Sequence, residues 1–456
     1  MKTSIRIALT AALPVLAAAG CSDFLSGGEL TNNPTTPTSA NISQIFLSTE
    51  VDFWAQQTQS LARLTGMWMQ QVEGVARQAK GTYEYTGVGE ATFDGEFILP
   101  YISGGLVDLR KVDSLARDAG DLQYLGAAQV IEAIEIGSTA DIWGDIPYSQ
   151  AARPDSFPDP QLDAQLDVYD QLQALLSDAI TNLSGEGPGP QDADLVYGGD
   201  PAAWIALAHT LKARLYLHTA EVNGTAAYAS ALAEAEQGIA SNDGDYLAIF
   251  NGGLQGESNP WYQFMNANGG TGRDGDIIAT SGTHLYSLLD DLDDPRRDEY
   301  YDLTNKAAGY LSDFRGGAAF MQPIVTYNEN LLIMAEAQYQ TGNAPGALES
   351  LEAEREAWGE ATPWHSAITL PSVSASGPAL LEAIMTEKYI TLFQNLEAWN
   401  DYKRTCVPAL VPVNGASVIP GRLPYGITER QTNPNVPEPS AQPARNANDP
   451  TPCPVP

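Results

Sequence analysis

Basic side chains are scarce in this sequence. Its 456 residues carry 23 Lys and Arg against 57 Asp and Glu, which gives a formal net charge of −34. A surface this acidic repels phosphate backbones, and anionic lipid headgroups do not hold it either. The composition therefore argues against binding to nucleic acids and against a peripheral protein attached by charge. It favours solubility, and it leans toward neutral or cationic ligands.

The motifs of common enzymes are also missing. The chain has no HExxH, CxxC, P-loop or GxSxG pattern. Residues 270–275 match a dinucleotide glycine fingerprint by spelling, but no strand precedes them. His209 and His218 are two and a half helical turns apart and face opposite sides, so they cannot share a metal ion. We predict no catalytic residue, no cofactor and no metal ligand.

Acidic residues are so common in this chain that a pair of them in the sequence does not indicate an active site. A glycosidase needs two carboxylates in one cleft, and chance pairs are expected throughout this chain. Four aspartates gather in residues 290–294 just before Pro295, without the spacing of an EF-hand. A solvated helix end is therefore favoured over a calcium site.

The N-terminus carries the pattern of an exported protein. Lys2 and Arg6 precede an apolar run over residues 7–19, and small residues follow. This is typical of a secretory signal peptide (1–20), and it is too short to span a bilayer. Cys21 directly after it resembles a bacterial lipobox, although Ala18 stands where Leu or Val is usual. The resemblance implies a triacylated Cys21, with palmitate among its chains, as an outer-membrane anchor.

The rest of the chain is predicted to be a tether followed by one domain. Residues 21–40 are rich in Gly, Ser, Thr and Pro and predict a flexible tether, and 41–456 predict a single folded domain. Cys406 and Cys453 remain after lipidation, and an oxidising compartment favours a disulfide between them. That bond would hold the Pro-rich tail (433–456) and contribute about 3–4 kcal/mol.

Hydrophobic spacing of three and four residues predicts a mainly α-helical fold. Asp200 before Pro201 is typical of a helix N-terminus. Helices are predicted over residues 45–64, 122–136, 166–183, 201–215, 227–239, 328–341, 344–356 and 379–399. Two of the helix pairs resemble tetratricopeptide units. The residues that carry this likeness are Trp204, Leu207, Ala208 and Leu211 in one pair, and Ala335, Tyr339, Gly342 and Ala347 in the other. Small residues are expected where the helices cross.

Long insertions at 76–104 and 241–325 interrupt the helices and predict binding loops. Sugar rings have apolar faces that stack on aromatic side chains, and hydroxyls that bond to Asn, Asp, Gln and Arg. Both insertions offer this mixture. The candidate ligand-binding residues are Arg77, Tyr83, Tyr85 and Phe93 in the first insertion, and Trp261, Tyr262, Phe264, Asn266, Asn268 and Arg273 in the second. For each aromatic residue, burial against the scaffold is the competing interpretation.

Five segments occur in a characteristic order behind Cys21. They are 140–148 (ADIWGDIPY), 160–170 (PQLD to VYD), 199–215 (GDPAAW to LKARL), 289–296 (ending in DPR) and 392–433 (LF, AWNDYKR, PGRLPY, then Glu429 and Asn433). Together they resemble the SusD/RagB family of outer-membrane nutrient-binding lipoproteins, in its SusD-like branch, over essentially the whole mature chain. The sequence departs from the family pattern at Cys406, where glycine is more usual, and at Gly426, where proline is frequent.

The resemblance implies a SusD-like fold of tetratricopeptide-like helix pairs with a second, loop-rich half. It also implies a lid that captures oligosaccharides, or peptides, and delivers them to a SusC-like TonB-dependent β-barrel transporter. The protein would then bind rather than catalyse. A surface-anchored glycosidase and a helical scaffold that binds only proteins are the alternatives. The sequence does not choose between a glycan and a peptide.

Overall fold

Packed helices build most of the protein. The computed structural model describes residues 40–102, 104–266, 272–302 and 309–455. The predicted signal peptide, Cys21 and nearly all of the predicted tether fall outside them. The longer helices are α3 (Ile42–Thr58), α4 (Ser60–Trp68), α7 (Leu106–Ala119), α8 (Leu122–Trp143), α9 (Gln165–Leu183), α10 (Pro201–His218), α12 (Thr225–Ala235), α16 (Tyr327–Gln340), α17 (Ala344–Ala357), α18 (Pro378–Thr391) and α19 (Glu397–Thr405). The predicted mainly helical class is confirmed.

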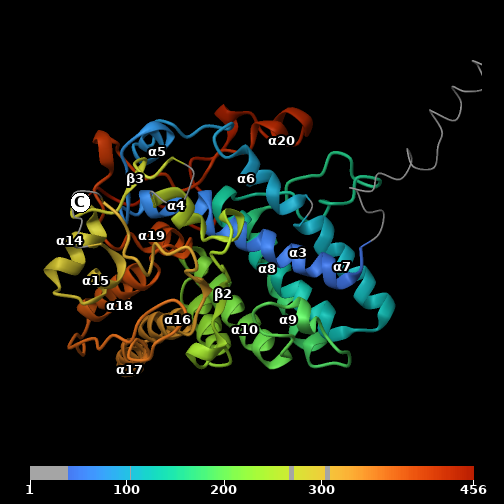
Figure 1. Cartoon of the computed structure of the whole chain (residues 1–456). Helices are drawn as coiled ribbons and strands as arrows, with labels where there is room; N and C mark the ends of the chain where they lie inside the picture. Colours follow the sequence, from blue (N-terminus) through green and yellow to red (C-terminus); the bar gives the residue numbers. More distant parts are fainter. Residues whose placement is uncertain (1–39, 103, 267–271, 303–308, 456) are drawn as a thin grey trace, which may run out of the picture. The chain divides into compact units, whose positions relative to one another are not determined.

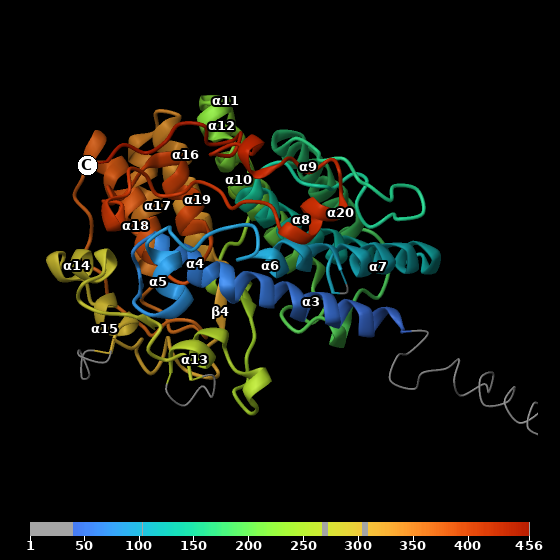
Figure 2. The same cartoon turned by 90° about the horizontal axis from the view of Figure 1, so that it is seen from above.

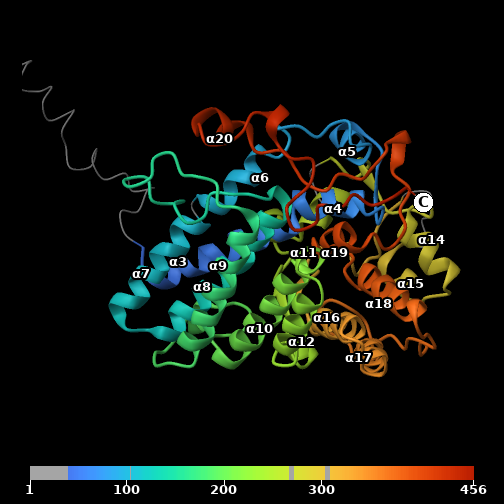
Figure 3. The same ribbon diagram turned by 180° about the vertical axis from the view of Figure 1, so that it is seen from behind.

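Neighbouring helices in sequence are neighbours in space. Contacts join α7 to α8, α8 to α9, α9 to α10, α10 to α12, α12 to α16 and α16 to α17. Figures 1 and 3 show this succession along one side of the structure. Within these pairs Ala213, Ala231 and Ala337 are completely buried in one cluster. Small side chains at such crossings let the helix axes approach, as the tetratricopeptide likeness predicts.

The second predicted helix pair is correct in its extent but not in every detail. Ala335 and Ala347 are buried in one cluster between α16 and α17, with Tyr339 packed against it. Gly342 does not lie at a crossing. It occupies the turn between the two helices with φ +89°, where glycine is favoured because it has no Cβ.

Two predicted helices are interrupted. The helix predicted over 45–64 is divided between α3 and α4 at Gln59, whose φ of −90° and ψ of −121° are not helical. The helix predicted over 379–399 ends at Thr391, and Gln394 has φ +67° before α19 begins. Tertiary contacts fix the second break, because the backbone carbonyl of the buried Gln394 accepts a hydrogen bond from Gln322 at 2.7 Å.

The insertions contain short elements rather than structureless loops. The first holds α5 (Arg77–Tyr83) and α6 (Asp94–Ile98), and α7 follows it. The second holds β2 (Tyr246–Ala248), α13 (Pro260–Met265), β3 (Ile277–Ile278), α14 (His284–Asp291), α15 (Arg296–Tyr300) and β4 (Gln322–Val325). β2 pairs antiparallel with β4, and β3 pairs antiparallel with β1 (Glu73–Gly74). In Figures 1 and 2, α5, α14 and α15 gather at the same end.

The C-terminal tail is attached to the helices covalently. The Cα atoms of Cys406 and Cys453 are 5.2 Å apart, and their sulfur atoms form a disulfide. Ile45–Pro456 form one compact unit. Among the described residues, no helix combines the length and the hydropathy that a membrane span requires.

Candidate functional site

The structure brings the two predicted binding loops together. Glu73 pairs with Ile278 and Gly74 with Ile277, so the small β1–β3 sheet joins the segment just before the first insertion to the second insertion. The backbone N–H of Ala76, in the first insertion, also donates a hydrogen bond to the carbonyl of Asp276. The carboxylate of Asp276, which has no exposed side-chain surface, lies 3.1 Å from the guanidinium of Arg77 and also pairs with Arg273. Arg77 and Arg273, predicted from separate loops, thus share one buried carboxylate.

Phe264 lies against guanidinium groups. The central guanidinium carbon is 4.3 Å from the ring centre in Arg63 and 5.2 Å in Arg273. Burial, together with the charge of Arg273, lowers the pKa of Arg63 to about 10 against the pull of Glu96. Arg63 was missed by the sequence analysis, because it lies on a predicted helix and no local motif connects it to Phe264. We call Phe264, Arg63, Arg77, Arg273 and Asp276 the Phe264 cluster.

The aromatic residues of the first insertion lie elsewhere. The ring of Tyr85 packs edge-on against Trp68, with 6.2 Å between ring centres. Tyr83 is half-buried, and burial raises its pKa to about 12. Phe93 is only 8% exposed, so its ring has little surface for a ligand. The structure therefore links Arg77 to the second insertion, whereas Tyr85 packs against Trp68.

Trp261 is not a platform for a ligand. Its side chain is completely buried, packed against Phe393 and close to Gly66, where an added Cβ would lie 3.2 Å from the indole ring. Trp261 lies in a predicted binding loop, but its large apolar ring is more stable when it is buried in the core than when it is exposed to a ligand or to solvent. Tyr262 and Asn266 are half-buried, and Asn268 falls outside the described residues.

Two predicted ligand residues have strained backbones. Arg77 has φ +49° and Tyr85 has φ +59°, in the left-handed region that side chains larger than glycine rarely adopt. Such conformations cost about 1 kcal/mol or more and concentrate at functional sites. Their presence at the first residue of α5 and two residues after its end supports a functional role for the first insertion.

A pocket of about 360 Å³ lies beside α13. Its walls are α3 and residues 249–263, and they combine aromatic rings with amide and carboxylate groups. The residues that contribute such side chains are Asp52, Trp54, Gln59, Phe250, Asn251, Glu257 and Gln263. Gln263 precedes Phe264, and Gln59 is one helical turn from Arg63. Pocket and cluster therefore share α13 and are neighbours at the junction of α3 and α4.

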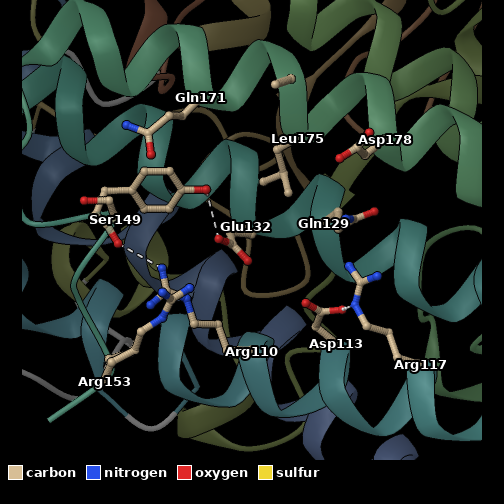
Figure 4. A pocket seen from close by; sticks show the side chains of 13 residues that line it. Arg110, Asp113, Arg117, Gln129, Glu132, Ser149, Arg153, Gln171, Leu175 and Asp178 are labelled. Carbon is tan, nitrogen blue, oxygen red and sulfur yellow. Dashed lines mark hydrogen bonds and ion pairs between the residues drawn. The ribbon is translucent and has the colours of Figure 1, made fainter. Parts of the chain in front are cut away.

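A larger pocket, of about 770 Å³, lies between α7, α8 and α9 (Figure 4). Its walls are mainly charged. The side chains include Arg110, Asp113, Arg117, Gln129, Glu132, Tyr148, Arg153, Gln171 and Asp178. None of these residues was predicted to bind anything. The signal that could have located the pocket is the apolar spacing of Leu106, Leu109, Val112 and Ala116, which predicts α7 and places its polar residues on one face.

Both histidines of α10 contact carboxylates. Imidazole nitrogens of His218 lie 2.9 Å from Asp141 and 2.8 Å from Glu397. Burial opposes protonation, but the two carboxylates outweigh it and raise the pKa of His218 to about 10. The Nδ1 atom of His209 lies 2.7 Å from a carboxylate oxygen of Glu234.

The aspartates of residues 290–294 bind arginine. Asp294 is buried and lies 2.7 Å from Arg296, which also pairs with Glu387. Asp290, at the exposed end of α14, pairs with Arg297. α14 ends at Asp291, as the helix-end interpretation predicts, although Asp294 is buried rather than solvated.

A model of the SusD-like family, described as starch-binding and associating with the outer membrane, matches residues 32–426 of this chain. The chain belongs to the SusD-like family. The predicted family is thus confirmed, and the family as described is one of binding proteins at the outer membrane. No curated protein matches the chain.

Solved structures share the SusD-like fold. A SusD/RagB family protein from Bacteroides thetaiotaomicron is 21% identical, with 91% of this chain and 98% of that one covered, at a TM-score of 0.69. A chitin-binding SusD homologue from Flavobacterium johnsoniae is 17% identical, with coverages of 90% and 98% and a TM-score of 0.69. At these identities the likeness shows the fold.

The family motifs of this SusD-like chain meet in its core. The buried Asp141 accepts a hydrogen bond from Tyr169 at 2.6 Å and pairs with His218. Arg214 binds Glu329 at 2.6 Å and lies 3.7 Å from Glu397. These residues come from distant motif segments or the helices beside them. The motifs therefore stabilise the scaffold, and they carry no information on the ligand.

Proposed function

We propose that this SusD-like protein captures oligosaccharide nutrients at the Phe264 cluster and the pocket beside α13. The observation that carries the proposal is the half-buried Phe264 ring surrounded by Arg63 and Arg273, with Arg77 and Asp276 next to them. An aromatic ring offers a surface for the apolar face of a sugar, and fixed guanidinium and carboxylate groups bond to its hydroxyls.

The charges of the Phe264 cluster narrow the ligand further. The guanidinium groups of Arg77 and Arg273 pair with one buried carboxylate, and that of Arg63 lies over the Phe264 ring. The cluster is therefore locally positive although the chain is strongly acidic. A cationic ligand is disfavoured there by repulsion, whereas neutral and acidic sugars are accepted. Net charge alone leaned toward neutral or cationic ligands, whereas the Phe264 cluster favours neutral or acidic ones.

Delivery to a transporter is the second part of the proposal. The lipobox-like Cys21 would anchor the protein in the outer membrane, facing the cell surface, and residues 21–40 would let it move as a lid. Its partner would be a SusC-like TonB-dependent β-barrel. Sequence patterns and the outer-membrane association of the family support this part.

Capture is tested by titrating lipid-free protein with maltohexaose and chitohexaose in a calorimeter. The family description names starch, and one similar structure is titled chitin-binding, so these are the first probes. We expect saturable binding of at least one, with the oligosaccharide recovered intact after prolonged incubation. Shortened products would favour the glycosidase alternative instead.

The partnership is tested by affinity purification from outer membranes. Full-length tagged protein is expected to bring down a large β-barrel, and a Cys21→Ser variant is expected to lose both the membrane fraction and the barrel. Recovery of the wild-type protein from the membrane without any barrel would contradict the delivery role while leaving capture intact.

A further inference from the structure

The pocket between α7, α8 and α9 is a groove with rigid walls. Gly126 lies against Leu183 and Gly137 against Leu172, so α8 and α9 are antiparallel, and only Gly120 and Asp121 separate α7 from α8. α8 forms the floor, and α7 and α9 run in the same direction along the sides. Residues seven apart on α7 or α9 are therefore about 10 Å apart along the groove.

One end of the groove is closed by an anchored loop, residues 146–153. Arg110 donates hydrogen bonds to the carbonyls of Tyr148, at 2.9 Å, and of Ala151. The hydroxyl of Tyr148 bonds to Glu132 at 3.0 Å, and Asp163 accepts bonds from the backbone of Tyr148 and Ser149 at 2.9 Å each. The loop thus holds the exposed Arg153 at this end.

The two ends of the groove differ in charge. At the loop end Arg110 and Arg153 lie near the single carboxylate of Glu132, which leaves a positive excess. At the other end Asp113 forms a 2.6 Å ion pair with Arg117, and Asp178 is an additional carboxylate. Among the residues that the structure describes, neither Arg153 nor Asp178 forms an ion pair. In Figure 4, Arg110 and Arg153 lie on one side of Glu132, and Asp178 and Arg117 on the other.

We propose that this groove binds a short zwitterionic peptide, with its carboxylate at Arg153 and its amino group at Asp178. The length follows from α9, where Gln171 and Asp178 are seven residues and about 10 Å apart along the groove. An extended chain advances about 3.3–3.6 Å per residue, so three residues cover that span. The volume of about 770 Å³ is within the range of small-ligand sites. Gln129 and Gln171 offer amide groups to the peptide backbone.

The test is calorimetric titration of the lipid-free protein with tri-alanine. Its C-terminal amide and its N-acetyl derivative are titrated in parallel. We expect tri-alanine to bind, and each blocked peptide to bind at least tenfold more weakly. Arg153→Gln should weaken tri-alanine at least tenfold and abolish the difference from the amide. Asp178→Asn should weaken the binding of tri-alanine at least tenfold and abolish its difference from the acetylated peptide. Lys111→Gln, an equal loss of charge on the exposed side of α7, is the matched control and should change nothing.

Three results would overturn the proposal. They are absence of tri-alanine binding, equal affinity for the blocked peptides, and displacement of tri-alanine by maltotriose, which would make the groove a sugar site. Arg153, Asp178 and Lys111 are exposed, so thermal unfolding is expected to be unchanged and serves as the check on folding. Phe264→Ala should leave tri-alanine binding intact, so failure here is distinguishable from failure of oligosaccharide capture.

Discussion

At the scale of single residues, Cys406 explains a departure from the family pattern. It follows the last residue of α19 with φ +58° and ψ +23°, the left-handed conformation in which helices commonly end with glycine. Glycine is also the usual residue at this position in the family. In this chain the position is occupied by Cys406, whose sulfur forms the disulfide with Cys453. The disulfide and the backbone strain therefore occur at the same residue.

This leads to a prediction about stability. Cys453→Ala combined with Cys406→Ala should lower the free energy of unfolding by about 2–4 kcal/mol, because the tail is no longer cross-linked. Cys453→Ala combined with Cys406→Gly should be about 1 kcal/mol more stable than the alanine pair, since glycine adopts positive φ without strain. Urea unfolding measures both differences. Equal stability of the two double variants would contradict the strain at Cys406.

Single residues also show why the candidate ligand site could be predicted only in part from the sequence. The sequence identified Phe264, Arg77 and Arg273 as candidates by their chemistry, and the structure places them in one cluster. It could not separate Phe264 from Trp261, because both are aromatic residues of one short helix and only tertiary packing buries the second. Arg63 is distant in sequence from the other members, so no local pattern connects it to them.

At the scale of elements, the crossing of α8 and α9 depends on a missing side chain. A Cβ on Gly126 would lie 2.6 Å from the Leu183 side chain and 2.8 Å from the Ala179 carbonyl oxygen. On Gly137, in the same helix, it would meet Leu215 and Leu172 at the ordinary distances of 3.5 and 3.6 Å. The two glycines therefore provide a matched pair.

We predict that Gly126→Ala lowers the free energy of unfolding by about 1–3 kcal/mol, because the helices must separate to admit the methyl group. Gly137→Ala should be neutral or stabilising by up to about 1 kcal/mol, since alanine is the better helix former. Chemical denaturation of both variants measures the contrast. If Gly126→Ala proved as stable as Gly137→Ala, this view of the crossing would be wrong.

The sequence predicted that a helix forms more reliably than it predicted the residues at which the helix ends. Spacing of apolar residues located α8, α9, α10, α16 and α17 with ends close to those observed, except that α8 continues to Trp143. Breaks at Gln59 and Gln394 escaped prediction, because one non-helical residue leaves the apolar spacing unchanged. The short elements α5, α6 and α13 are set by contacts between distant segments, which no local window contains.

At the scale of the whole molecule, buried carboxylates make stability depend on pH. Burial raises the pKa of Glu50 to about 8 and of Asp245 to about 7. The stability from such raised groups is complete below their unfolded values and is lost as pH rises through the folded ones. Glu336 differs, because Arg404 and Lys388 outweigh burial and lower its pKa to about 2. Its contribution is present above about 4.5 and is lost as pH falls toward 2.

The unfolding temperature should therefore be highest in mildly acidic solution and fall on both sides. Glu50→Gln should flatten the decline between about pH 5 and 8 and stabilise the protein at pH 8 by roughly 1–3 kcal/mol. Glu50 accepts hydrogen bonds from the backbone N–H of Leu195 at 2.9 Å and from the Tyr246 hydroxyl at 3.1 Å. The Oε1 atom of glutamine can accept the first bond, and its Nε2 atom can donate to the oxygen of Tyr246 in place of the second. Glu382→Gln, on an exposed part of α18, is the control. A pH profile unchanged by Glu50→Gln would contradict the assignment.

The whole molecule combines a core stabilised by family motifs with the ligand face that we propose for its insertions. This division agrees with the buried ion pairs of His218 and Arg214 and with the partly exposed Phe264 cluster.

The affinity of the lipid-free protein for the bound oligosaccharide, before and after Phe264→Ala, tests this account most directly. We predict a loss of at least tenfold, which is about 1.4 kcal/mol, because the sugar loses its stacking surface. Phe264→Tyr should stay within about threefold, and Phe157→Ala, at another partly exposed phenylalanine, should have no effect. Unchanged affinity in a correctly folded Phe264→Ala protein would place the ligand elsewhere and contradict the account.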